Sequence, residues 1–174
     1  MAEVFFKTDR LRMRALTEHD FDQMYAVYSH PEVITYVADG EAISKEDCHI
    51  WIERTLKNYQ TQGYGLTVIE SKDGESFIGF VGVTHPRGQP EPEIKYSLYP
   101  EFWGKGYATE VVQGMLAYVA SKCGLKRVIA TTDPENIPSH RVLEKCGMKH
   151  FRTEVDEDGD DSKDYEWFAE TARN

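Results

Sequence analysis

The order in which two kinds of hydrophobic periodicity follow one another constrains the fold of this chain more than any other feature. Short segments in which apolar residues alternate or run together between turn residues predict strands, whereas apolar residues three or four positions apart predict helices. Along the chain these segments read strand, two helices, three strands, helix, strand, helix and two strands. Helices interspersed among strands in this way are typical of an α/β (α+β) protein with a mixed sheet.

Capping and turn residues mark the boundaries of these elements. Thr17 followed by Asp20 forms a capping-box pattern, Ser44 is a second helix cap, Gly63 ends a helix, and Pro31 is expected to end the first one. The predicted helices run from the Thr17 cap to about residue 29, from the Ser44 cap to residue 62, and over residues 107–123 and 138–145. The predicted strands cover residues 11–16, 65–70, 76–84, 93–98, 127–132, 148–155 and 165–169.

The size and charge of the chain narrow the classes of function. Its 174 residues are close to the roughly 150 residues of an average domain, so a single domain spanning residues 1–174 is expected. Lys and Arg number 20 against 30 Asp and Glu, which gives a formal net charge of -10. This charge argues against unaided binding to nucleic acid or to an anionic membrane surface and favours a cationic partner.

The distribution of apolar residues and cysteines predicts a cytoplasmic protein. The N-terminus lacks the basic region of a secretion signal, and no apolar run approaches the roughly 18 residues needed to cross a bilayer. Cys48, Cys123 and Cys146 are an odd number of cysteines far apart in the sequence, which suits reduced thiols better than a disulfide framework.

A binding or catalytic site is expected in residues 101–109, a glycine-rich stretch between a predicted strand and a predicted helix. Small residues at a helix start leave backbone N–H groups uncovered, and with the helix dipole these groups form a site for phosphate oxygens. The stretch does not fit a Walker A loop, because Gly106 rather than Ser or Thr follows Lys105, nor a dinucleotide fingerprint, because Thr109 takes the third glycine position. The alternative is a turn that only packs a helix on the sheet.

At this stretch the chain resembles the GNAT superfamily of acetyl-CoA-dependent N-acetyltransferases. The pyrophosphate signature of that family maps onto Trp103, Gly106 and Ala108, with Trp103 in place of the usual Gln or Arg. The surrounding residues 99–110 are similar to the RimJ/RimL-type branch, which resembles ribosomal-protein N-terminal acetyltransferases.

A second match to this family lies in residues 133–148. There Asn136, then Ser139, then a Leu-Glu-Lys run that ends at Gly147 agree with the family pattern. The two motifs stand in the family's order, and the resemblance covers nearly the whole chain. It implies the GNAT fold, with a mixed, mostly antiparallel sheet of seven strands flanked by about four helices.

The resemblance further implies that acetyl-CoA is the acetyl donor. Its pyrophosphate is expected on the amides of residues 104–109 and its pantetheine along the predicted strand at residues 93–98. In a chain of net charge -10, binding of a polyanion needs a concentrated local donor set, which this helix start and Lys105 supply. The implied donor-binding residues are Tyr96, Ser97, Leu98, Trp103, Gly104, Lys105, Gly106, Tyr107, Ala108, Thr109, Asn136 and Ser139.

Glu93 is the candidate proton acceptor for the attacking amine. An alkyl ammonium has a pKa of about 10, so the amine must lose a proton before it attacks a thioester. Glu93 would accept that proton directly or through a water, and the alternative is a solvated residue at a strand edge. A backbone N–H near residues 96–98 is expected to hold the developing oxyanion.

Ser139 is the candidate proton donor for the departing CoA thiolate. Many GNAT enzymes use a tyrosine at the position that here holds Leu143, whereas the RimJ/RimL branch is thought to use a serine three residues after the Asn. The alternatives are a water-linked donor, stabilisation of the thiolate alone, and a role for Ser139 in capping the helix. Asn136 is expected to bond the pantetheine, to order the turn, or both.

Tyr36, Asp39 and Glu41, between the first two predicted helices, are expected to contribute to the acceptor site. The acidic run at residues 156–161 could also attract a cationic amine, although charge runs at turns are more often solvated surface. No metal site is expected, because Cys48 and His49 are adjacent on a helix and point apart, and the acidic run departs from the EF-hand pattern.

These observations predict an acetyl-CoA-dependent N-acetyltransferase that moves an acetyl group to a primary amine by direct attack in a ternary complex. The resemblance suggests a protein or peptide N-terminal amine as acceptor, and a small polyamine or an antibiotic amine is the alternative. Two further alternatives are a non-catalytic acyl-CoA-binding or sensing module and an interaction protein that has kept only the fold. A monomer and a homodimer are both compatible with the sequence.

Overall fold

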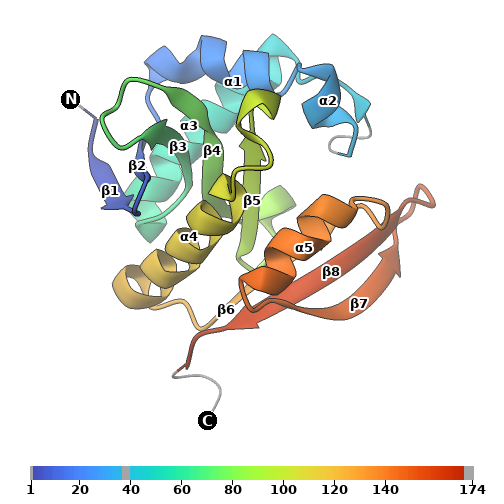
Figure 1. The fold of residues 1–174 in the computed structure, drawn as a ribbon. Helices are drawn as coiled ribbons and strands as arrows, with labels where there is room; N and C mark the ends of the chain where they lie inside the picture. Colours follow the sequence, from blue (N-terminus) through green and yellow to red (C-terminus); the bar gives the residue numbers. More distant parts are fainter. Residues whose placement is uncertain (1, 37–39, 171–174) are drawn as a thin grey trace.

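A computed structural model describes residues 2–36 and 40–170 and joins their strands in one sheet (Figure 1). The order across the sheet is β1-β2-β3-β4-β5-β6-β8-β7. Neighbouring strands are antiparallel except β5 and β6, which are parallel, so the predicted mixed and mostly antiparallel sheet is confirmed. The strands are β1 (Val4–Lys7), β2 (Leu11–Ala15), β3 (Leu66–Ser71), β4 (Phe77–Thr84), β5 (Glu93–Leu98), β6 (Arg127–Thr132), β7 (Lys149–Val155) and β8 (Asp161–Phe168).

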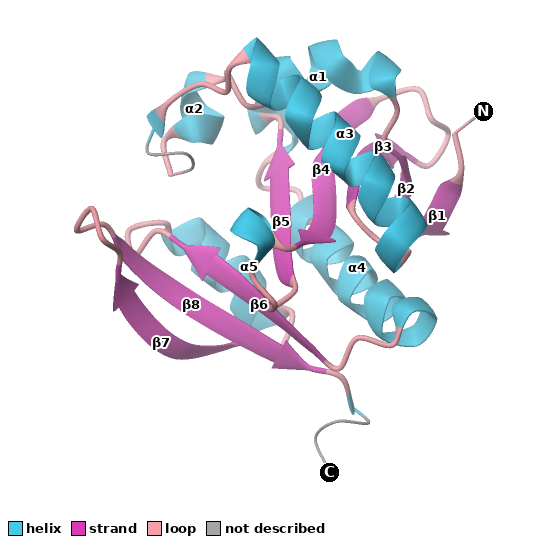
Figure 2. Cartoon of the chain, turned by 180° about the vertical axis from the view of Figure 1, so that it is seen from behind, coloured by secondary structure: helices cyan, strands magenta, loops and turns pink. Residues whose placement is uncertain are grey.

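Helices cover both faces of this sheet. Figure 1 shows α4 and α5 in front of it, and Figure 2, from behind, shows α1 and α3 on the opposite face. Each face has its own buried cluster: Met115 and Leu143 belong to the one under α4 and α5, and Met24 and Ile52 to the one under α1 and α3. The α-helices are α1 (Phe21–Val27), α2 (Pro31–Ile34), α3 (Lys45–Gln62), α4 (Tyr107–Cys123) and α5 (Ile137–Lys145).

The predicted helix caps are confirmed. Thr17 and Asp20 form a reciprocal capping box at a short 3-10 turn that leads into α1. The Ser44 hydroxyl accepts a hydrogen bond of 3.0 Å from the backbone N–H of Asp47 at the start of α3. Gly63 ends α3 with a φ of +81°, a conformation that favours glycine.

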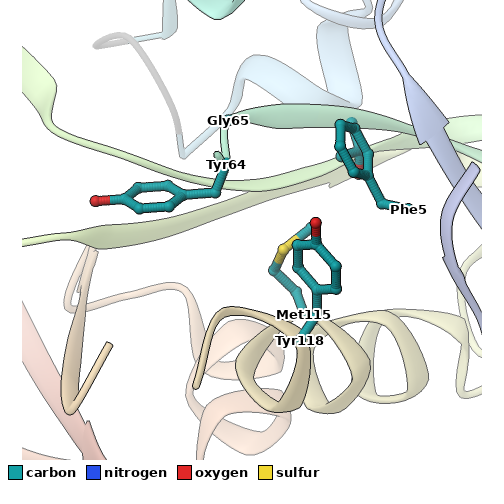
Figure 3. A pocket seen from close by; sticks show the side chains of 6 residues that line it. Phe5, Tyr64, Gly65, Met115 and Tyr118 are labelled. Atoms are coloured by element: carbon teal, nitrogen blue, oxygen red, sulfur yellow. The ribbon is translucent and has the colours of Figure 1, made fainter. Parts of the chain in front are cut away.

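The sheet has eight strands rather than seven, because β1 was not predicted. A bulge between Val4 and Phe6 breaks the alternation that identifies a strand. Phe5 and Phe6 consequently both reach Tyr118 of α4, with ring centroids 5.8 Å and 5.3 Å away. Figure 3 shows Phe5, Met115 and Tyr118 around a small hollow whose volume of about 0 Å³ leaves no room for a water molecule, so this contact is core packing.

Two further boundaries differ from the prediction. The first helix ends at Val27, and Pro31 opens the additional helix α2 because proline fits the first helical position, where its missing N–H is not needed. The described residues therefore contain five α-helices rather than about four. Strand β8 begins at Asp161 rather than at residue 165, because Lys163 and Asp164 already pair with β6.

The sheet opens between β5 and β6. These strands share one register pair in the described residues, Glu93 with Ile129, and then diverge, as Figure 1 shows. The edge of β5 that faces β6 is therefore left without a partner strand after its first residue. The candidate site lies in this opening.

Candidate active site

A cleft of about 710 Å³ lies where β5 and β6 separate. Its walls come from α2, β5, the loop that leads into α4, the end of β6, and α5. This volume lies within the range of small-molecule and cofactor sites. The cleft is lined by most of the donor-binding residues predicted from the sequence: Tyr96, Ser97, Leu98, Trp103, Gly104, Gly106, Tyr107, Ala108, Thr109, Asn136 and Ser139.

The loop before α4 has the geometry of an anion site. Gly104 and Gly106 have φ values of +73° and +80°, in the left-handed region that side chains disfavour. Gly106 is the N-cap of α4, and no side chain in the described part of the chain caps this helix start. The first N–H groups of a 17-residue helix therefore face the cleft without a side-chain acceptor, which favours a bound anion there.

A brace from the β1–β2 turn holds this loop. The Arg10 guanidinium donates to the Lys105 carbonyl at 2.9 Å and to Glu110 at 2.7 Å, and it lies 4.4 Å from the ring centroid of Tyr107. The Thr8 hydroxyl also donates to Glu110, at 2.6 Å. Partial burial acts to raise the pKa of Glu110, but the hydrogen bonds from Thr8 and Arg10 outweigh it and hold that pKa below its ordinary value.

Cations gather along the cleft in a chain of net charge -10. Lys95, Arg141 and Lys145 line it, against the two carboxylates of Glu32 and Asp133. In the part of the chain that the structure describes, no ion pair joins Arg141 or Lys145 to a carboxylate. These two side chains stand four residues apart on α5, so they share a face and can meet an anionic ligand.

Tyr96 and Ser139 meet inside the cleft. Strand alternation directs Tyr96 toward α5, and its phenol oxygen lies 2.5 Å from Ser139 Oγ. The cap of α5 is Asn136, whose side-chain oxygen accepts from the backbone N–H of Ser139 at 3.3 Å, so Ser139 is not the capping residue. Asn136 thus orders the turn, as expected, and burial raises the pKa of Tyr96 to about 12.

Glu93 lies on the face of β5 opposite to the one that carries Tyr96, and it is not among the residues that line the cleft. It is 3% exposed, so it is buried rather than solvated. Its carboxylate accepts a hydrogen bond of 2.9 Å from the Thr131 hydroxyl and forms an ion pair with Lys95. Thr131 and Lys95 do line the cleft, so Glu93 is separated from it by the two side chains that it binds.

Of the three predicted acceptor residues, the structure places one in the cleft lining. Tyr36 lines the cleft and is 40% exposed. Glu41 is exposed and is not among the lining residues, and Asp39 lies outside the described residues. The Lys105 side chain is also absent from the lining and lies near the Phe102 ring instead.

Sequence reasoning missed three basic residues and one hydroxyl contact. Arg141 and Lys145 carried a signal, since they are i and i+4 on a predicted helix that contains the second motif. Arg10 gave no signal in the sequence, because the residues that it contacts lie about a hundred positions away along the chain. The contact between Tyr96 and Ser139 joins residues 43 positions apart and likewise depends on the tertiary fold.

Other kinds of site are not found within residues 2–36 and 40–170. No group of three or more His, Cys, Asp and Glu side chains there could hold a metal ion. Cys48, Cys123 and Cys146 are free, and burial raises the pKa of Cys48 and of Cys146 to about 11, which disfavours a reactive thiolate. No helix among these residues combines the length and hydropathy that a membrane crossing requires.

Similarity to known proteins agrees with this geometry. Residues 10–149 match the family described as Acetyltransferase (GNAT) domain. YnaD of Bacillus subtilis, an uncharacterized N-acetyltransferase, is 33% identical, with 82% of this chain and 81% of YnaD covered. The crystal structure of an acetyltransferase from Agrobacterium tumefaciens superimposes with a TM-score of 0.84 at 24% identity and covers 97% of this chain and 96% of its own.

Two structures solved with ligands share the fold. RimL, a ribosomal L7/L12 alpha-N-protein acetyltransferase in complex with coenzyme A, has a TM-score of 0.77 at 15% identity, over 95% of this chain and 98% of its own. The spermidine N-acetyltransferase of Vibrio cholerae, in complex with CoA and spermine, has a TM-score of 0.76 at 20% identity, over 94% and 98%. Because the family match and the identity to YnaD each extend over about four-fifths of the chain, this protein belongs to the GNAT acetyltransferase family and is an acyltransferase.

Proposed function

We propose that this enzyme transfers an acetyl group from acetyl-CoA to the N-terminal amine of a protein or peptide, by direct attack in a ternary complex. The observation that carries the proposal is the cleft at the β5–β6 opening. Within the described residues it combines a helix start without a side-chain cap, two cations without an ion-pair partner, and a free strand edge. One domain over residues 1–174 and a cytoplasmic location with reduced thiols are part of the same proposal.

The donor side of the cleft suits acetyl-CoA as a substrate. The first N–H groups of α4 are suited to the pyrophosphate, and Arg141 and Lys145 supply positive charge beside it. The free edge of β5 can pair with the amide groups of pantetheine in the manner of an added strand. Trp103, whose indole N–H donates to the Leu98 carbonyl at 2.9 Å, fixes the end of that strand.

Glu93 accepts the proton of the attacking amine in this proposal. Because its carboxylate lies behind Thr131 and Lys95, the proton reaches it through a water or through the Thr131 hydroxyl. The backbone N–H groups on the free edge of β5 are available for the oxyanion of the thioester carbonyl. Ser139 lines the cleft from the other face of β5 and interacts with the departing thiolate in this proposal, so the two groups act from opposite sides of the opening.

The charges that line the cleft favour a monocationic acceptor over a polyamine. A polyamine carries several ammonium groups and is best held by several carboxylates, whereas Glu32 and Asp133 are the carboxylates among the described lining residues. One free amine, as at a peptide N-terminus, needs one proton acceptor. RimL acts on a protein N-terminus and the Vibrio cholerae enzyme on spermidine, so both acceptor classes occur on this fold.

Calorimetric titration tests the donor assignment. Acetyl-CoA is expected to bind, and NAD and ATP, which carry phosphates without pantetheine, are expected to bind at least about tenfold more weakly. Mass spectrometry after incubation with acetyl-CoA then compares peptides with free and with blocked N-termini, and spermidine. Acetylation of free N-termini alone supports the acceptor assignment, whereas acetylation of spermidine alone overturns it.

Glu93→Gln separates catalysis from binding. We expect turnover to fall about 100-fold, in the range of general-base effects, while the affinity for acetyl-CoA stays unchanged. Glu154→Gln, at an exposed position on β7, is the matched control. Turnover of Glu93→Gln equal to the wild type would remove Glu93 from the mechanism, and binding without turnover in the wild type would favour a non-catalytic acyl-CoA module.

A further inference from the structure

The Tyr96 phenol has one hydrogen-bond partner in the described residues, the hydroxyl of Ser139 at 2.5 Å. The Tyr96 side chain packs against the buried cluster under α4 and α5 and also lines the cleft. Ser139 lines the same cleft from the first turn of α5. The two hydroxyls therefore form an isolated pair at the edge of the core.

The acidity of the two hydroxyls sets the direction of this hydrogen bond. Each hydroxyl can donate one proton and can also accept. A phenol is more acidic than an aliphatic alcohol, so the Tyr96 hydroxyl is the better donor and Ser139 Oγ is the better acceptor. With Tyr96 as the donor, the serine proton is free to point into the cleft.

We propose that Tyr96 is a positioning residue that turns the Ser139 O–H toward the sulfur of the bound thioester. This inference rests on the proposed function. When the amine attacks, the carbon–sulfur bond breaks and its electron pair stays on sulfur. The Ser139 proton, held in that direction, donates a hydrogen bond to the thiolate as it forms.

The pair stabilises the thiolate by hydrogen bonding rather than by giving up a proton. Burial raises the pKa of Tyr96 to about 12, while an alkyl thiol has a pKa of about 8.5. Moving the phenol proton through Ser139 to sulfur would therefore be unfavourable. Both hydroxyls stay protonated near neutral pH, and the thiolate takes its final proton from solvent after it leaves. The proton lost by the amine leaves on the other face, through Glu93.

The test measures the pKa of the CoA thiol when CoA is bound to the enzyme. Ultraviolet difference spectra between the complexes with CoA and with desulfo-CoA report the thiolate as pH is raised. We expect the wild type to lower this pKa relative to free CoA, and Tyr96→Phe and Ser139→Ala to raise it again by about one unit, a tenfold change in ionisation. Ser139→Thr, which keeps a hydroxyl, is expected to retain the wild-type value.

Tyr118→Phe is the matched control, because Tyr118 lies at the closed hollow of Figure 3, outside the cleft. It is expected to leave the thiol pKa unchanged, and thermal melting checks that each variant is folded. A purely structural role for Tyr96 predicts the wild-type thiol pKa in Tyr96→Phe, and this result overturns the inference. Failure of the wild type to bind CoA at all overturns the proposed function, and this inference with it.

Discussion

The two sides of the cleft are built in different ways. The proposed donor side consists of a helix start that no described side chain caps, a free strand edge and a helix cap, and Arg10 braces it through three contacts. The proposed acceptor side consists of α2, four residues long, whose side-chain hydrogen bonds among the described residues are local, such as that from the Thr35 hydroxyl to the Pro31 carbonyl. The proposed donor side is thus held by contacts between several elements, whereas the proposed acceptor side is one short helix.

This difference explains why the donor is easier to identify than the acceptor. A phosphate site made of backbone N–H groups requires glycine at fixed positions, and that requirement is visible in any sequence. An acceptor site made of exposed side chains on a short helix requires no such signature. This difference in construction implies that the two sides respond independently, so a variant on one side should leave the other side unaffected.

Gly106→Asp has the largest expected effect on the donor side. Gly106 has a φ of +80°, so any side chain is strained there, and a carboxylate would stand at the helix start where the pyrophosphate is proposed to bind. We expect acetyl-CoA to bind at least about 100-fold more weakly, which corresponds to about 2.7 kcal/mol. Calorimetric titration measures this change.

Two variants separate charge from backbone strain at this position. Gly106→Asn has a similar shape without the charge and is expected to lose less affinity than Gly106→Asp. Gly124→Asp places the same side chain at the other end of α4, where φ is +71° and nothing lies within 4 Å, and is expected to bind acetyl-CoA normally. Equal affinity of Gly106→Asp and the wild type would exclude the loop as the pyrophosphate site.

Much of the fold, and the loop of the proposed donor side, could be predicted from sequence because these signals are local. The Thr17 and Ser44 caps, the bounds of β5 and β6, and the placement of Gly104 and Gly106 before α4 all depend on residues within a few positions of one another. In such segments the short-range physical chemistry and the tertiary fold favour the same conformation.

The features that sequence could not provide depend on contacts between distant parts of the chain. Strand β1 escaped prediction because its bulge turns Phe5 and Phe6 toward the same helix, which removes the period of two. Glu93 is buried behind Thr131, 38 residues away, a position that no local pattern encodes. The Tyr96–Ser139 pair and the Arg10 brace could not be predicted from the sequence for the same reason.

Arg10→Gln tests the brace and has the next largest expected effect. Loss of the bonds to Lys105 and Glu110 leaves the loop in place but less fixed, so we expect acetyl-CoA affinity to fall about tenfold. Glu110→Gln is expected to act similarly, and the double variant to add little to either change, because both break one network. Additive losses would show that the two residues act separately.

The brace should also depend on pH in a defined direction. The pKa of Glu110 is held below its ordinary value, so its carboxylate stabilises the folded state above pH of about 4.3, and this contribution is lost as pH falls through the lower folded-state pKa. The wild type is therefore expected to lose its advantage in melting temperature over Glu110→Gln in acid. A difference that stays constant down to pH of about 2 would contradict this.

Arg141→Gln and Lys145→Gln are expected to have a smaller effect, each weakening acetyl-CoA about threefold to fivefold. Both cations line the cleft without an ion-pair partner in the described residues, so each is free to meet an anion, but each remains partly screened by solvent. The salt dependence of binding should flatten in both variants. Lys149→Gln, exposed on β7 outside the cleft, should leave affinity and salt dependence as in the wild type.

Tyr36→Ala is expected to have the smallest effect on acetyl-CoA affinity. It tests directly whether the proposed donor and acceptor sides of the cleft act independently. Tyr36 lines the cleft from the end of α2 and is 40% exposed, so its ring can contact an acceptor without supporting the loop before α4. We expect acetyl-CoA affinity within about twofold of the wild type and a KM for the acceptor peptide raised about threefold to tenfold, with Tyr36→Phe keeping most of the ring contact. Loss of acetyl-CoA affinity in Tyr36→Ala as large as that in Arg10→Gln would mean that α2 also holds the donor, and the two sides of the cleft would then have to be treated as one site.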